Sequence, residues 1–159
     1  MFDLIVFCSG QRKVVKDFPN NRIWIEVEQR YCDIWKCLSE QKGIWYTLSI
    51  DSEEIGGTKL CDHIDSESNF DTLGIAKEVA EGLTPYKIRA DYADEFKDII
   101  QTLLESSPLG MVYVLARYQS LDAEVVLGTY SKEKFFDLMQ AEKIYANVCY
   151  IITKFPNAL

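Results

Sequence analysis

The chain has 159 residues, of which 48% are hydrophobic and 13% aromatic. This composition is typical of a chain that folds around a core, and it excludes a disordered chain, which would carry few aromatic residues. The net charge is −8 at pH 7. Because an acidic chain repels phosphate backbones, we expect no direct binding of nucleic acid. The length favours one domain spanning residues 1–159.

The sequence also indicates the cellular compartment in which the protein is expected. It has no run of about 18 apolar residues, so no transmembrane helix is predicted. The apolar start is too short for a signal peptide and carries Asp3 where a signal would carry Lys or Arg. The five cysteines are an odd number at irregular spacing, which argues against a disulfide framework. We therefore expect a cytoplasmic protein, with Cys8 and Cys149 as buried thiols inside apolar strands.

The acidic charge is concentrated in the middle of the chain. Residues 1–50 carry seven basic and six acidic side chains, whereas residues 51–110 carry five basic and fourteen acidic ones. Residues 111–159 carry five of each. An acidic patch attracts basic partners and speeds their encounter. The alternative is that the acidity only keeps the protein in solution.

Strands and one long loop are predicted in the first half of the chain. Apolar and β-branched runs predict strands at 2–8, 23–28 and 44–50. Residues 31–39 favour a short helix. The stretch 51–71 has seven acids and one Lys, which predicts a long surface loop that includes a short strand near Leu60.

Two helices and a hairpin are predicted in the next part of the chain. Apolar residues at helical intervals predict helices at 71–83 and 91–106, the second with Asp91 as its N-cap. Strand-like runs at 111–119 and 123–130, joined by a short polar connection, predict a β-hairpin.

The last elements complete the predicted fold. Ser131 is predicted to cap a helix that carries Phe135, Leu138 and Met139, and residues 148–153 form a final buried strand. The order of the elements favours an α+β domain with a mainly antiparallel sheet and about three to four helices.

No metal or cofactor is expected. The chain's single His is His63, in Cys61-Asp62-His63, and Cys32 and Cys37 have no second pair with zinc spacing. The acids of the loop do not match a calcium-binding template. The sequence has no phosphate-binding or dinucleotide-binding glycine motif.

One enzymatic alternative is centred on Cys8. This residue ends a predicted strand and is followed by Arg12 and Lys13, which would lower the pKa of a nearby thiol. A small enzyme could then act on an anionic substrate through Cys8 with Arg12 or Lys13. However, a partner base is missing nearby, and a buried core Cys8 is the more common situation. We therefore expect a protein that is not an enzyme.

The C-terminal third resembles a known family. Its outline is a helix, a hairpin, a helix and a closing strand over residues 92–154. The residues that carry the likeness are Tyr118-Gln119, Glu124 to Tyr130, Glu133-Lys134-Phe135-Phe136 and Asn147 to Ile152. This part is similar to the immunity proteins of bacterial polymorphic-toxin and contact-dependent growth inhibition systems.

The resemblance implies a small cytoplasmic inhibitor that occludes the active site of a cognate toxin domain. Such toxins are often nucleases, whose substrate groove must be basic to hold phosphates. An acidic loop that mimics those phosphates would fit such a groove, and the inhibitor would contribute no catalytic residue. The predicted partner contacts are Asp51, Glu53, Glu54, Asp62, Asp65 and Glu67. A further alternative is an adaptor subunit with an apolar binding face.

Overall fold

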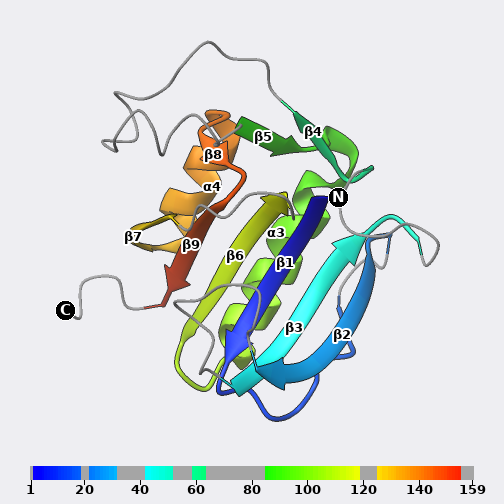
Figure 1. The fold of residues 1–159 in the computed structure, drawn as a ribbon, viewed down its shortest axis with the longest axis vertical. Helices are drawn as coiled ribbons and strands as arrows, with labels where there is room; N and C mark the ends of the chain where they lie inside the picture. Colours follow the sequence, from blue (N-terminus) through cyan, green and yellow to red (C-terminus); the bar gives the residue numbers. More distant parts are fainter. Residues whose placement is uncertain are drawn as a thin grey trace.

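The computed structural model describes residues 2–18, 22–31, 42–51, 59–63, 85–118 and 125–154 (Figure 1). Six strands form one sheet in the order β2-β3-β1-β6-β9-β7. They are β1 (Phe2–Ser9), β2 (Trp24–Tyr31), β3 (Lys42–Ser49), β6 (Met111–Tyr118), β7 (Val125–Tyr130) and β9 (Val148–Thr153). All neighbours are antiparallel except β7 and β9. The prediction of an α+β fold with a mainly antiparallel sheet is thus confirmed.

The strand β1 lies near the centre of the sheet because its side chains are apolar on both faces. Leu4, Val6 and Cys8 join the core under the helices, whereas Ile5 and Phe7 join a second apolar cluster on the opposite face. A strand that is buried on both faces reads as a continuous apolar run. This confirms the buried strand predicted at 2–8.

The predicted hairpin of residues 111–119 and 123–130 is wrong. The strands β6 and β7 are not neighbours, because β9 lies between them, antiparallel to β6 and parallel to β7. Five of the six residues of β9 are buried, so this strand belongs inside the sheet, whereas β7 has an exposed Val126 and forms an edge. Sequence proximity favoured the hairpin, but burial of the apolar β9 decides the order.

Two helices cover one face of the sheet, α3 (Ala90–Ser106) and α4 (Lys132–Gln140) (Figure 1). The helix α3 starts one residue before the predicted cap, so its N-cap is Arg89 and Asp91 lies in the first turn. There its carboxylate still favours the positive end of the helix dipole. In α4 the predicted cap is confirmed, since the Ser131 hydroxyl accepts a hydrogen bond from the Lys134 amide at 3.1 Å.

The number of helices differs from the prediction. The described residues contain two helices rather than three to four. The helix predicted at 71–83 lies outside the described residues, as do residues 32–39 of the helix predicted at 31–39. Its first residue, Tyr31, is the last residue of β2, because it pairs with Lys42 across the sheet.

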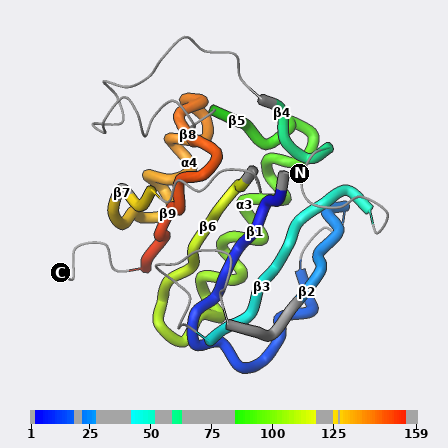
Figure 2. Tube along the Cα trace, in the orientation of Figure 1, coloured from blue at the N-terminus to red at the C-terminus, as the bar shows by residue number. Residues whose placement is uncertain are grey.

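A second, three-stranded sheet lies at one end of the molecule, as the Cα trace in Figure 2 shows. It consists of β4 (Cys61–His63), β5 (Pro85–Ile88) and β8 (Ile144–Tyr145), in the order β4-β5-β8. Of these strands only β4 has a counterpart in the sequence prediction, the short strand near Leu60. Within the described residues, no helix is both long and apolar enough to cross a membrane.

Candidate functional site

Two of the predicted partner contacts are described, and both are exposed. Asp51 follows directly after β3, where the hydroxyl of Ser49 donates a hydrogen bond to the Asp51 carbonyl oxygen at 3.1 Å. Asp62 lies in the middle of β4, the edge strand of the small sheet. The other four predicted contacts, Glu53, Glu54, Asp65 and Glu67, lie outside the described residues.

The start of α3 adds carboxylates next to β4. The amide of Arg89 donates to the Leu60 carbonyl oxygen at 3.0 Å, so the first helical turn lies beside the residue that precedes β4. Asp91 and Asp94 are exposed on that part of the helix. Cations are present as well, because the Arg89 guanidinium donates to the Lys59 carbonyl oxygen at 3.2 Å. The sequence reasoning did not include Asp91 and Asp94 among the partner contacts, because it placed them in a predicted helix, with Asp91 as its N-cap.

Cys8 does not have the environment that the enzymatic alternative requires. Its side chain has no exposed surface, and burial raises the pKa of its thiol from 9.0 to about 12. The expectation that Arg12 and Lys13 lower this pKa is wrong, because burial of the thiol is the cause that acts on it and burial raises the pKa. Cys8 and Cys149 are instead buried thiols, as the apolar strand pattern predicted.

Beyond β1 the chain folds back along the sheet and forms a cleft that the prediction did not include. Gly10 has a φ of +76°, which favours glycine, and its amide donates to the Lys42 carbonyl oxygen at 2.8 Å. The next residue, Gln11, is buried and held by two side-chain hydrogen bonds. Its amide nitrogen donates to the Ser106 hydroxyl at 3.0 Å, and its amide oxygen accepts from the Tyr46 hydroxyl at 2.5 Å.

The same tyrosine fixes the rest of this segment. The amide of Val15 donates to the Tyr46 hydroxyl at 3.1 Å, while the ring of Phe18 packs edge-on against the Tyr46 ring with centroids 6.1 Å apart. Burial raises the pKa of Tyr46 to about 12. The hydroxyl therefore keeps its proton at neutral pH and holds residues 11–18 as a fixed strap across the sheet.

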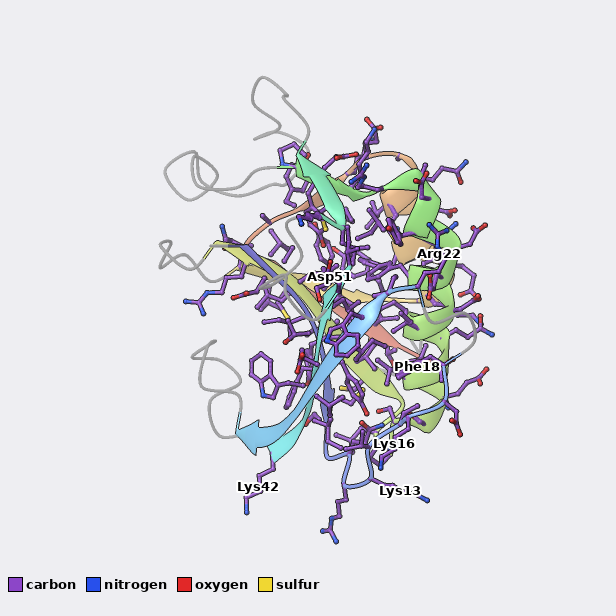
Figure 3. All side chains as sticks on the ribbon, turned by 90° about the vertical axis from the view of Figure 1, so that its right-hand side faces the viewer. Lys13, Lys16, Phe18, Arg22, Lys42 and Asp51 are labelled. Atoms are coloured by element: carbon purple, nitrogen blue, oxygen red, sulfur yellow. The ribbon has the colours of Figure 1, made fainter. Side chains whose placement is uncertain are left out.

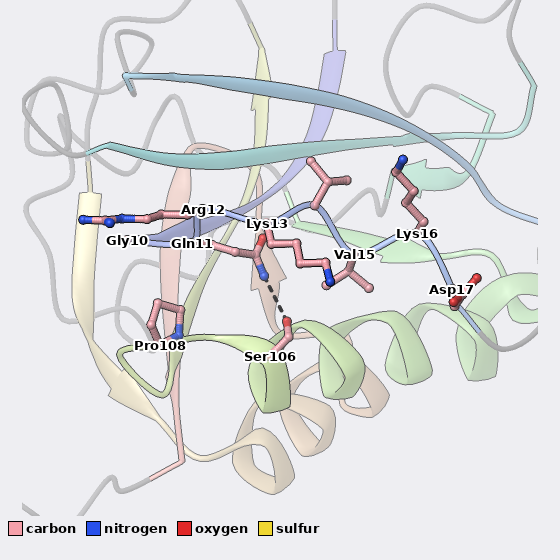
Figure 4. Close-up of a pocket in the computed structure, with 10 residues that line it drawn as sticks. Gly10, Gln11, Arg12, Lys13, Val15, Lys16, Asp17, Ser106 and Pro108 are labelled. Carbon is pink, nitrogen blue, oxygen red and sulfur yellow. Dashed lines mark hydrogen bonds between the residues drawn. The ribbon is translucent and has the colours of Figure 1, made fainter.

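This strap lines a cleft of about 750 Å³ together with Ser106 and Pro108 (Figure 4). Arg12, Lys13 and Lys16 contribute three cations to its lining, against one carboxylate, Asp17. Figure 3 shows Lys13, Lys16 and Lys42 at one end of the molecule, away from Asp51. The sequence signal for its basic lining, though not for the cleft itself, is the cluster of basic residues at 12–16 in an otherwise acidic chain.

Within the described part of the chain, no three His, Cys, Asp or Glu side chains group as metal ligands. No protein-family model, curated protein or solved structure matches the chain. The acidic surface and the basic cleft are therefore the two features of the described residues that bear on function.

Proposed function

We propose that this chain is a non-catalytic binding protein that neutralises a basic toxin domain, of the nuclease type, by covering its active site with an acidic surface. The observation that carries the proposal is the exposure of Asp51 at the start of the acidic stretch 51–71 and of Asp62 within it. The exposed Asp91 and Asp94 lie on the first turns of α3, beside β4, and add carboxylates next to the strand that carries Asp62.

The physical reason is electrostatic complementarity. A nuclease must hold phosphates in a basic groove, and that groove also attracts a surface of carboxylates. Complementary charge speeds association and selects against partners of the wrong sign. The acidic segment 51–71 carries seven carboxylates and only one Lys.

The proposal is tested by capture and then by reconstitution. The full chain is used as bait in a lysate of the source organism at low salt, and proteins that elute as the salt rises are identified by mass spectrometry. A captured basic domain is purified, and its affinity and toxic activity are measured with and without the chain. We expect tight binding that weakens with salt, and loss of the toxic activity in the complex.

A matched pair of variants locates the surface. Asp51→Asn with Asp62→Asn removes two carboxylates from the proposed surface, whereas Glu133→Gln with Asp137→Asn removes two exposed carboxylates from α4. The first variant is expected to bind the captured domain on the order of tenfold more weakly. The second is expected to bind like the parent. Equal affinity of both variants at low salt would contradict the acidic-surface proposal.

A further inference from the structure

The two halves of the helix-bearing face of the sheet are covered differently. The helix α3 packs on β1, β5 and β6, and α4 packs on β7 and β9. Over the half formed by β2 and β3, the strap of residues 11–18 lies against the sheet instead (Figure 3). A single extended segment is narrower than a helix, so it covers less apolar surface.

The strap leaves an apolar groove beside the edge strand β2. Val14 and Val15 on the strap and Ile25 and Val27 on β2 pack against the core, yet all four remain only half-buried. They line a groove of about 470 Å³, with the exposed Trp24 at its border. Apolar side chains that stay half-buried around a concave surface are typical of a binding groove.

The apolar groove and the basic cleft share part of their lining. Val14, Val15 and Lys16 line both cavities, so the strap borders both of them. At the basic end the lining carries Arg12, Lys13 and Lys16, and Asp17 is the carboxylate among the lining residues. An occupant that spans both cavities would thus meet apolar side chains first and positive charge next.

We propose that this composite groove is a docking site for a segment of a partner protein in which apolar anchor residues are followed by acidic residues. The anchors would occupy the space between the strap and β2, and the acids would face Lys13 and Lys16. The charge complementarity selects an acidic segment, because a basic one would place like charges together. The buried Gln11 and Tyr46 hold the strap in place, so the groove is formed before the partner arrives.

This site differs from the acidic surface in position and in sign. The acidic surface would bind a basic toxin domain, while the composite groove would bind an acidic segment. Asp51 and the basic residues Lys13 and Lys16 lie apart in Figure 3. The docking proposal therefore does not depend on the toxin proposal and goes beyond it.

The test uses the full chain and a defined probe, the blocked peptide Leu-Leu-Phe-Asp-Glu-Asp-Glu. A control peptide has Lys in place of each acid. Binding is followed by nuclear magnetic resonance, with the backbone amides and the Trp24 indole of the chain as reporters. We expect the acidic peptide to shift the signals of residues 12–16 and of Trp24. The lysine peptide is expected to leave them in place.

Two charge-reversal variants provide the matched comparison. Lys13→Glu with Lys16→Glu reverses the charge of two residues that line the cleft. Lys134→Glu with Lys143→Glu makes the same change in net charge at exposed positions on and after α4. The first is expected to weaken binding of the acidic peptide on the order of tenfold, and the second to leave it within about twofold. Circular dichroism of both variants verifies that each is folded.

Three results would overturn the proposal. The first is an equal response to the acidic and the lysine peptide. The second is equal weakening by the two reversal variants. The third is that inorganic pyrophosphate shifts residues 12–16 while the peptide does not, which would make the cleft a site for small anions rather than a docking site.

Discussion

The two halves of the helix-bearing face of the sheet are closed by different means. Under α3 the side chains of Phe96, Ile100 and Leu103 have no exposed surface. Over β2 and β3 the strap of residues 11–18 leaves Val14 and Val15 half-buried and depends on polar contacts to stay in place. A helix thus closes a core through packing, whereas an extended strap must be fixed by hydrogen bonds and leaves a groove.

The sharpest test of this contrast truncates one apolar side chain in each half. Phe96→Ala removes a fully buried ring from α3 and is expected to lower the free energy of unfolding by about 3–5 kcal/mol. Val15→Ala removes a half-buried side chain from the strap, and we expect a loss of less than about 1 kcal/mol, because water already reaches this site. Urea denaturation measures both values. Similar losses would mean that the strap closes its half of the core as completely as the helix does.

The second test uses pH. Because burial raises the pKa of Cys8 from 9.0 to about 12, the folded state holds the thiol proton more tightly than the unfolded state does. The stability from this group is fully present below pH 9 and is lost as the pH rises toward 12. The Cys8→Ala variant is expected to lose less stability than the parent between about pH 8 and pH 10. Parallel curves of unfolding free energy against pH would show that Cys8 is accessible to water when folded.

Most strands and both described helices follow from local patterns. The apolar run at 2–8, the stripe of α3 and the Ser131 cap each act within a few residues, and each was predicted close to its observed bounds. The pairing order was not predictable in this way. Placing β9 between β6 and β7 depends on which strand must be buried on both faces, and that is a property of the whole sheet.

The candidate site shows the same division between features that follow from local sequence and features that depend on distant contacts. The acidic character of residues 51–71 could be read from the sequence, and the exposure of Asp51 and Asp62 is consistent with it. The basic cleft could not be predicted, because it forms when residues 10–17 meet Ser106 and Pro108, about 90 residues further along the chain. The hydrogen bond from Gln11 to Ser106 is the contact that brings these segments together.

Glu95 provides a smaller effect, confined to the start of β2. One of its carboxylate oxygens accepts hydrogen bonds from the amides of Arg22 and Ile23, the second at 3.0 Å. Glu95→Ala leaves these amides without an acceptor and is expected to cost about 1–3 kcal/mol. Hydrogen exchange should quicken at residues 22–24 first. Asp94→Ala, at the exposed neighbouring position, is the control. It is expected to change neither the free energy of unfolding nor the exchange rates at residues 22–24.

The smallest effects compare two buried hydroxyls. The Tyr150 hydroxyl accepts from the buried Tyr145 amide at 2.8 Å, and the Tyr46 hydroxyl accepts from the partly exposed Val15 amide at 3.1 Å. Tyr150→Phe leaves an amide that water cannot reach, and Tyr46→Phe leaves the Val15 amide and the buried Gln11 oxygen without this hydroxyl, so we expect a loss of about 2 kcal/mol for each variant. Both values come from urea denaturation.

Hydrogen exchange separates the two variants. Tyr46→Phe removes the contact that fixes the strap, so exchange at Val15 should quicken while the protection of α3 stays unchanged. The Gln11 amide oxygen also loses its donor in this variant, although its amide nitrogen can still bond to Ser106. If Val15 exchanged at the same rate in parent and variant, the strap would be fixed by its apolar contacts. The contrast between a packed helix and a hydrogen-bonded strap would then be wrong for this half of the sheet.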